Sequence, residues 1–217
     1  MKSGLIKAWR EYRGLALFLF LMIIFRSALA DWNVVPTGSM KPTILEGDRI
    51  LVNKLAYDFK IPLTQISIYK FADPKRGDVV VFDSKLADTR LVKRVIGLPG
   101  DTVEMRDNRL TINGIDAQYF AVEYSDDAIF AIESYLGMSH RIELARTGKS
   151  RLSTFGPVKV PKDRYLVLGD NRDNSADSRV YGFIPRNEIV GNARTIVISL
   201  NYDHYYLPRV DRFFRLL

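Results

Sequence analysis

The chain has 217 residues, of which 47% are hydrophobic, 26% charged and 12% aromatic, a composition typical of a folded chain rather than a disordered one. It contains no cysteine, which excludes disulfides, thiol catalysis and cysteine-based metal sites. The formal net charge of +7 favours an anionic partner such as a membrane surface. No zinc finger, RNA-binding signature or dense Lys/Arg helix is present, so the sequence predicts no nucleic-acid partner.

A basic stretch followed by an apolar segment opens the chain. Residues 1–13 carry four basic side chains and one acidic one, and residues 14–25 are apolar. A spanning helix needs about 20 apolar residues, a length reached if the helix begins earlier and its basic side chains snorkel. Two interpretations are open: a signal peptide cleaved after Ala-Leu-Ala at 28–30, or an uncleaved anchor. The basic end favours the cytoplasm, so we expect residues 1–31 to form a cytoplasmic stub and transmembrane anchor, with residues 32–217 as an extracytoplasmic catalytic β domain.

Short β-branched segments, separated by glycine and proline, dominate the chain after residue 48. The predicted strands are 49–54, 78–82, 90–96, 102–106, 109–112, 164–168 and 194–199. Asp107 and Asn108 lie between two of them and predict a two-residue hairpin turn. Strands this short favour a coiled sheet over alternating strands and helices. The predicted fold class is mainly β, a coiled antiparallel β-sheet or barrel with one N-terminal transmembrane helix.

Two segments depart from this pattern. Residues 117–157 show no sustained period and are predicted to be an insertion or excursion from the core, with a short helix over 128–136. The tail, residues 201–217, mixes tyrosines and phenylalanines with arginines. It fits equally well a segment that lies on a membrane or one that packs on the domain.

Ser39 is the first candidate for chemistry. It lies in Pro-Thr-Gly-Ser-Met-Lys-Pro-Thr at 36–43, where proline and glycine keep the backbone out of a strand ladder. The Ser39 N–H and the Thr37 hydroxyl are then available as an oxyanion hole. A plain turn is the alternative interpretation. The two histidines, His140 and His204, lie far apart in the sequence and are predicted to be structural or exposed, with no metal site.

Lys93 is the candidate base. In a strand it shares a face with Leu91 and Val95, while Val92 and Arg94 point the other way. If the first of these faces is the core, burial removes water from the ammonium and lowers the lysine pKa by several units. A neutral amine can then take a serine proton, so the sequence predicts a membrane-anchored Ser-Lys protease. The alternative is an edge lysine whose face has been misassigned.

The segment Gly169–Arg179 is densely polar and directly follows an apolar predicted strand. A solvated loop and a calcium site are possible interpretations, but its spacing does not match the helical calcium loop. A hydrogen-bonded support loop accounts for more of its side chains. In this interpretation Ser175 orients the Lys93 amine, and Asp177 pairs with Arg179 to hold the loop.

Four sequence boxes, in this order, resemble those of bacterial type I signal (leader) peptidases. They are Thr-Gly-Ser-Met at 37–40 with Pro42, Arg-Gly-Asp-Val-Val at 76–80, Lys93-Arg94 with Gly-Leu-Pro-Gly-Asp at 97–101, and residues 169–179. The resemblance covers nearly the whole chain after Asp31. It implies a membrane-bound Ser-Lys endopeptidase that removes signal peptides from exported preproteins after Ala-X-Ala and needs no cofactor. It also implies residence in the cytoplasmic membrane as a single-pass protein.

The resemblance also implies roles for individual residues. Ser39 resembles the nucleophile and Lys93 the general base, while Thr37 and the Ser39 N–H resemble the oxyanion hole. Residues Ser175, Asp177 and Arg179 resemble the supporting residues. We expect shallow pockets for small substrate residues to be walled by Val34, Val35, Ile44 and Val92. Two features depart from the family pattern: threonine stands at position 37 where many members have serine, and there is one apolar N-terminal segment where some members have two.

Three alternatives remain open. A specialised relative would process pilin or conjugation substrates with the same dyad. A self-cleaving repressor-type protease shares the chemistry, but no DNA-binding helical domain precedes Ser39. A membrane-tethered β domain without enzymatic activity would bind partners or cell wall. The sequence does not predict an oligomeric state.

Overall fold

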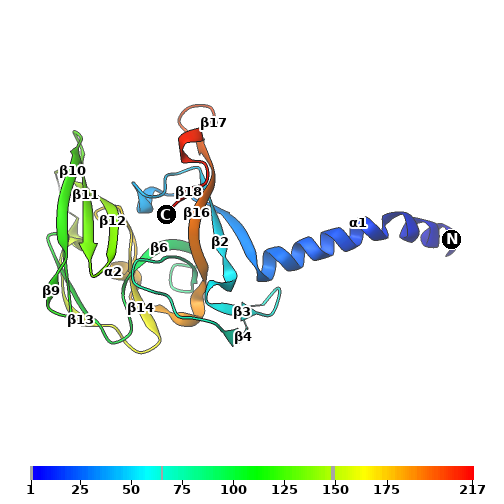
Figure 1. Cartoon of the computed structure of the whole chain (residues 1–217), viewed down its shortest axis with the longest axis horizontal. Helices are drawn as coiled ribbons and strands as arrows, with labels where there is room; N and C mark the ends of the chain where they lie inside the picture. Colours follow the sequence, from blue (N-terminus) through cyan, green and yellow to red (C-terminus); the bar gives the residue numbers. More distant parts are fainter. Residues whose placement is uncertain (1, 65, 148–149) are drawn as a thin grey trace.

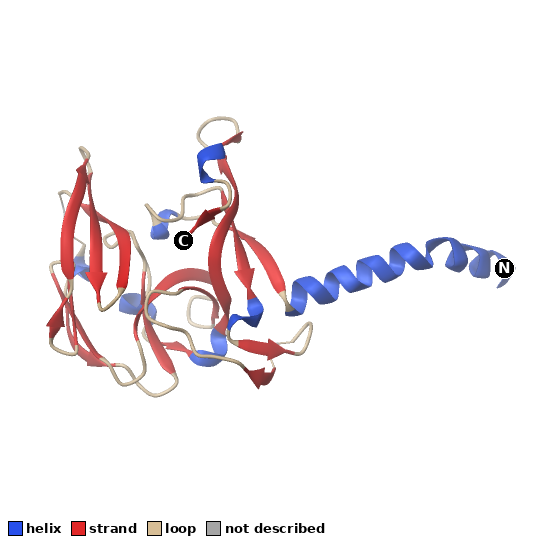
Figure 2. Ribbon diagram, in the orientation of Figure 1, coloured by secondary structure: helices blue, strands red, loops and turns tan. Residues whose placement is uncertain are grey.

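The computed structural model describes residues 2–64, 66–147 and 150–217. One long helix, α1 (Lys2–Ala28), extends away from a β-rich body (Figures 1 and 2). It has 27 residues and leads almost directly into β1 (Ala30–Val34). Within the described ranges, no helix is both long enough and apolar enough to cross a membrane.

The main sheet is antiparallel and follows the order β1-β2-β16-β5-β6-β14-β15, with β17 and β18 also paired to β16. Beyond β1, its strands are β2 (Asp48–Asn53), β5 (Val79–Ser84), β6 (Thr89–Gly97), β14 (Arg164–Leu168), β15 (Ile184–Pro185), β16 (Ile189–Asn201), β17 (Leu207–Pro208) and β18 (Arg215–Leu216). Residues 79–82 of β5 are buried on both faces, whereas β2 alternates buried and exposed residues. The centre of the sheet is therefore buried on both faces, whereas its flank at β2 is buried on one face only.

The barrel alternative is wrong, because the path of the main sheet ends at β1 and β15 without closing. Three register shifts interrupt the pairing of β16 with β2 and β5. Bulges of this kind bend a strand and increase its local twist. The prediction of a mainly β, antiparallel fold is confirmed, in the form of a curved open sheet.

Three smaller sheets complete the body. The strands of the first are β10 (Gln118–Tyr124), β11 (Ala128–Tyr135) and β12 (Met138–Ala145), and this unit is called the three-stranded sheet below. The second has β13 (Phe155–Lys159), β7 (Thr102–Arg106), β8 (Arg109–Ile112) and β9 (Ile115–Asp116), and the third has β3 (Asp58–Lys60) and β4 (Ser67–Lys70). The short helical segments are α2 (Ser178–Tyr181), η1 (Gly38–Met40), η2 (Lys54–Ala56), η3 (Arg151–Ser153), η4 (Arg186–Glu188) and η5 (Val210–Arg212).

The helix predicted over 128–136 is wrong, because these residues form β11. Ala131, Glu133 and Tyr135 are buried in alternation, which is the period of a strand. Because one of the buried positions is a glutamate, the pattern of apolar residues alone does not reveal this alternation. Whether 117–157 is an insertion stays a prediction, although most of it forms the three-stranded sheet.

Other sequence predictions hold closely. All seven predicted strands are present, and those at 102–106, 109–112 and 164–168 have the predicted bounds. Asp107 and Asn108 both have positive φ in the turn between β7 and β8, as a two-residue hairpin requires. The tail packs on the domain, since β17 and β18 pair with β16.

Candidate active site

Ser39 lies in η1, on a short turn that leaves the end of β1. Its neighbours Val35 and Met40 are buried in a core cluster shared with β2 and β5, and this burial fixes both sides of the turn. The Ser39 carbonyl accepts a hydrogen bond from the Asn171 N–H (3.1 Å). A Cβ added at Gly169 would collide with the same carbonyl oxygen, so only glycine allows this close approach. The main chain of Ser39 is held on one side, and its hydroxyl faces a cavity.

Lys93 reaches the same cavity from the middle of β6. The residue is 2% exposed, and its Nζ donates hydrogen bonds to Ser39 Oγ (2.6 Å) and to the Val92 carbonyl (3.0 Å). Burial lowers the pKa of Lys93 from 10.5 to about 8, against the opposing charges of Asp177 and Asp170. Roughly a tenth of the amine is therefore neutral at pH 7, and half of it at a pH of about 8.

The polar loop 169–179 is a network of hydrogen bonds centred on Asp177. The carboxylate of Asp177 accepts from the Gly169 N–H (2.9 Å), from Ser175 Oγ (2.8 Å) and from the guanidinium of Arg179 (2.7 and 2.8 Å). Asp177 also caps α2 through the Arg179 N–H. Ser175 thus donates to Asp177, while the Lys93 amine is oriented by the Val92 carbonyl.

The carboxylates weighed as calcium ligands are engaged by protein donors. Asp170 binds Arg94, and Asp173 accepts from Asn108 Nδ2 (2.8 Å) and from two backbone N–H groups. No group of three or more candidate ligands capable of holding a metal ion occurs in the described part of the chain. These carboxylates hold the loop against neighbouring segments through hydrogen bonds and an ion pair.

The cavity that holds Ser39 and Lys93 measures about 350 Å³. It is lined by Asn33, Val34, Val35, Pro36, Thr37, Ser39, Met40, Thr89, Arg90, Leu91, Val92 and Lys93. Three of the four residues named from the sequence as pocket walls are present. Ile44 is fully buried in the core cluster beneath the turn instead. The Thr37 hydroxyl lies 3.5 Å from Ser39 Oγ.

Two strand edges face this cavity. Along the described chain β1 pairs only with β2, and residues 89–93 of β6 pair only with β5. Leu91 and Met40 were not named as pocket walls from the sequence. The alternation along β6, which places Leu91 on the face of Lys93, was a signal for Leu91; Met40 carried none beyond its adjacency to Ser39.

A second charged cluster begins one residue after Lys93. Arg94 is buried and forms a bidentate ion pair with Asp170 (2.7 and 2.9 Å), which also accepts a hydrogen bond from the Thr43 hydroxyl (2.5 Å). The charges of Arg94 hold the pKa of Asp170 below its usual value in spite of complete burial. Sequence reading missed this pair, since its partners lie 76 positions apart.

The cluster continues through His140 into the three-stranded sheet. Glu133 pairs with Arg172 in a bidentate geometry (2.6 and 2.7 Å) and accepts from the Tyr119 hydroxyl (2.6 Å). His140 Nε2 lies 3.5 Å from Glu133 Oε1 and 3.7 Å from Asp170 Oδ1, and neither ring nitrogen has a hydrogen-bond partner among the described residues. Burial, reinforced by the charge of Arg94, lowers the pKa of His140 to about 4. The imidazole is neutral at ordinary pH.

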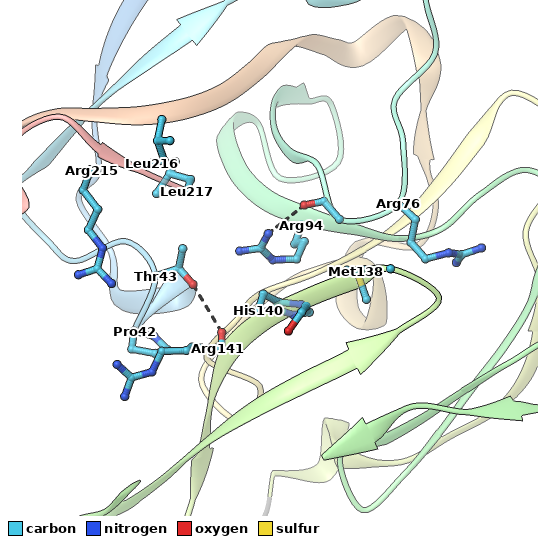
Figure 3. A pocket seen from close by; sticks show the side chains of 13 residues that line it. Pro42, Thr43, Arg76, Arg94, Met138, His140, Arg141, Arg215, Leu216 and Leu217 are labelled. Carbon is cyan, nitrogen blue, oxygen red and sulfur yellow. Dashed lines mark hydrogen bonds between the residues drawn. The ribbon is translucent and has the colours of Figure 1, made fainter. Parts of the chain in front are cut away.

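Figure 3 shows His140, Arg94 and Thr43 around a cavity of about 350 Å³ whose lining also includes Arg76 and Arg215. This cavity and the one that holds Ser39 share no lining residue. The two neighbouring residues Lys93 and Arg94 therefore serve two separate polar environments.

A serine hydroxyl beside a desolvated lysine amine is chemically capable of acting as a nucleophile with a neighbouring base. The family described as signal peptidase, peptidase S26, matches residues 9–198. Signal peptidase I of Pseudomonas aeruginosa PAO1 is 35% identical over 83% of this chain and 69% of its own length. Signal peptidase I T of Bacillus subtilis strain 168 is 34% identical over 87% of this chain and 84% of its own.

The crystal structure of a signal peptidase I from Enterococcus faecalis V583 is 30% identical and covers 57% of this chain and 98% of that one, with a TM-score of 0.36. At that score the likeness carries no conclusion about the fold, and the sequence matches decide the assignment. The chain belongs to the signal peptidase family, peptidase S26, and is a serine endopeptidase.

Proposed function

We propose that the chain removes N-terminal signal peptides from exported preproteins, cutting after small residues with Ser39 as nucleophile and Lys93 as general base. The observation that carries the proposal is the 2.6 Å contact between a buried amine and the Ser39 hydroxyl. Among the described residues no carboxylate forms a hydrogen bond or ion pair with Lys93, so the lowering of its pKa by burial outweighs the opposing charges of the more distant Asp177 and Asp170. That is the condition for a lysine to accept a proton.

The reaction proceeds through an acyl-enzyme. Ser39 Oγ attacks the substrate carbonyl carbon as its proton moves to the neutral Lys93 Nζ, giving a tetrahedral intermediate. The C–N bond then breaks, and Lys93 returns the proton to the leaving amine. Water hydrolyses the ester formed on Ser39, again with Lys93 as base. The neutral fraction of the amine increases as pH rises through about 8, so the rate should rise over the same range.

The developing oxyanion has two donors close to the nucleophile. The Ser39 N–H and the Thr37 hydroxyl lie on the same turn, and the hydroxyl is 3.5 Å from Ser39 Oγ. Threonine retains the hydroxyl and restricts its rotation about χ1, which reduces the freedom lost when it donates to the oxyanion.

Substrate binding follows from the free strand edges. An extended peptide between β1 and residues 89–93 of β6 would gain main-chain hydrogen bonds from both sides. Its side chains would then meet Val34, Val35, Leu91 and Val92. These walls and the volume of about 350 Å³ suit small apolar side chains rather than charged ones.

The proposal includes membrane attachment through α1, with the β domain outside the cytoplasm. The helix exposes a continuous run of large apolar side chains: Leu15, Leu17, Phe18, Leu19, Phe20, Leu21, Met22, Ile23 and Phe25. The β3–β4 hairpin, which contacts Ser27 at the end of α1, exposes a further set: Leu63, Ile66, Ile68 and Tyr69. Exposed apolar side chains in such numbers on two neighbouring elements support a membrane or protein interaction site.

One experiment tests both parts. The full chain is reconstituted with phospholipid vesicles and mixed with a preprotein that carries an Ala-X-Ala site, and cleavage is compared with that by Ser39→Ala. We expect cleavage after the second alanine, loss of activity by a factor on the order of 10³ or more in the variant, and activity that floats with the vesicles. Full activity in Ser39→Ala refutes the mechanism, and activity left at the bottom of the gradient refutes the attachment.

A further inference from the structure

The three-stranded sheet contacts the polar loop that supports the nucleophile. Glu143 of β12 and Asn171 form an isolated parallel bridge. The Glu143 N–H donates to the Asp170 carbonyl (2.8 Å), and the Arg172 N–H donates to the Glu143 carbonyl (3.0 Å). The backbone of β12 therefore fixes the loop on both sides of Asn171.

Asn171 connects this fixed loop to the active site. Its backbone N–H donates to the Ser39 carbonyl (3.1 Å), at the point where Gly169 permits the close approach. Lys93 is fixed independently, since it pairs with Val80 of β5, the next residues of β6 pair with β14, and its Nζ donates to the Val92 carbonyl. The Ser39 turn is thus the part of the dyad whose position depends on the loop.

The side chain of Glu143 strengthens the same link. Its Oε1 accepts a hydrogen bond from Asn171 Nδ2 (3.1 Å). The carboxylate is half-buried near Lys41 and Glu46, which form an ion pair (2.8 Å) just after the nucleophile. Burial raises the pKa of Glu143, with the charge of Lys41 acting in the opposite direction. Glu143 therefore links β12, to which it belongs, with the polar loop through a hydrogen bond, and it lies within the electrostatic range of Lys41 beside the Ser39 turn.

We propose that Glu143 is a positioning residue, which acts through Asn171 to hold the Ser39 main chain so that Oγ stays within reach of Lys93 Nζ. The inference rests on the proposed function of Ser39 and Lys93. Glu143 touches neither the Lys93 amine nor the Ser39 hydroxyl, and its effect is on geometry. Because reactions between oriented groups are sensitive to small displacements, a loosened Asn171 should reduce the rate of acylation more than the affinity for substrate.

A double-mutant cycle tests the link. The variants are Glu143→Ala, Asn171→Ala and the double variant, measured as kcat and KM on the full chain in vesicles. Loss of one hydrogen bond predicts a fall in kcat of about 3- to 10-fold for each single variant, with KM within about twofold. The kcat of the double variant should be no lower than that of the slower single variant, because both substitutions break the same hydrogen bond. The midpoint of the pH–rate profile should not move, since the surroundings of Lys93 are unchanged.

Two further variants separate positioning from folding. Glu143→Gln keeps an acceptor for Asn171 Nδ2 and should restore kcat to within about twofold of the parent. Glu123→Ala removes an exposed carboxylate of the same sheet, paired with Arg141, and should leave kcat unchanged. The melting temperature of each variant shows that kcat refers to folded protein.

The positioning role is overturned if Glu143→Ala and Asn171→Ala retain the parent kcat, or if their losses multiply in the double variant. It is also overturned if Glu143→Gln is as slow as Glu143→Ala. Ser39→Ala in the same assay distinguishes the two levels of failure. An active Ser39→Ala refutes the proposed function itself, whereas an inactive Ser39→Ala beside unaffected Glu143 variants refutes only the positioning role.

Discussion

Lys93 and Arg94 are adjacent in β6, both are buried, and their environments are opposite. Lys93 meets a hydroxyl and a carbonyl, and its pKa falls to about 8. Arg94 meets the carboxylate of Asp170 in a bidentate pair and the carbonyl of Gly77 (2.9 Å). The same strand therefore places one cation where its charge is disfavoured and the next where its charge is neutralised by a partner.

The difference shows that burial alone does not determine the state of a buried cation. A carboxylate at hydrogen-bond distance offsets desolvation for Arg94, while Lys93 has Asp177 and Asp170 only as more distant charges. We expect the first arrangement to contribute rigidity to the framework and the second to reduce stability in exchange for a reactive amine.

Replacing the lysine should give the largest change in activity. Lys93→Met removes the base and should reduce turnover by a factor on the order of 10²–10⁴. The folded protein should become more stable by about 1–3 kcal/mol at pH 7, because an unbranched apolar side chain of similar length carries no buried charge. Denaturant unfolding at fixed pH measures the gain.

The extra stability of Lys93→Met should depend on pH, because the pKa of Lys93 differs between the folded and unfolded states. In the parent chain the folded pKa of about 8 lies below the unfolded value of 10.5, so the unfolded state binds more protons between these two values. The parent should therefore gain stability as pH rises from 8 to 10.5, and the advantage of Lys93→Met should shrink over that window. A variant less stable than the parent at pH 7 contradicts the assignment of a desolvated base.

Replacing the partner of Arg94 should have the opposite effect on stability. Asp170→Asn leaves a buried guanidinium without its counter-charge and should destabilise the fold by about 3–5 kcal/mol. Glu104→Gln is the matched control, because its pair with Arg106 is at the surface (3.2 Å) and should contribute under about 1 kcal/mol. Equal losses in the two variants would show that the buried pair does not stabilise the framework.

The contact between Ser39 and Lys93 was easier to predict from the sequence than the framework that holds it. Ser39 and Lys93 are recognisable because each stands in a local pattern: a turn with proline and glycine, and a lysine between aliphatic residues of one strand face. The pairs of Arg94 with Asp170 and Glu133 with Arg172 have no local pattern, since their partners lie 76 and 39 positions apart and meet only in the folded chain. Glu133 also prevented the prediction of β11, because a charged residue in a sequence is normally expected to face solvent, whereas Glu133 is buried in the core.

Two other errors have the same kind of cause. Ile44 was expected among the walls of the substrate pocket, but it is fully buried in the core cluster and does not line the cavity. Closure of the sheet depends on how the bulges in β16 curve it, and single-strand patterns carry no such information. Local sequence thus specified the strands and the reactive residues, and long-range packing decided the rest.

The smallest expected effect concerns His140, the neutral member of the charged cluster. Its folded pKa of about 4 lies below the ordinary value of 6.5, so the unfolded state binds more protons between pH 6.5 and 4. Stability should therefore fall as pH drops through that window, by on the order of 1–3 kcal/mol from this residue. Over most of this pH range two ion pairs around the imidazole stay formed: Arg94 with Asp170, and Arg172 with Glu133.

His140→Gln, which does not titrate, should lose less stability than the parent between pH 6.5 and 4.5, as measured by denaturant unfolding at several pH values. His204→Gln lies in an exposed segment and serves as the control, with a slope like that of the parent. An identical slope in His140→Gln would mean that the folded imidazole takes up its proton over the same pH range as the unfolded one. In that case its positive charge would lie within 4 Å of both carboxylates, and His140 would be a third cation of the cluster rather than its neutral centre.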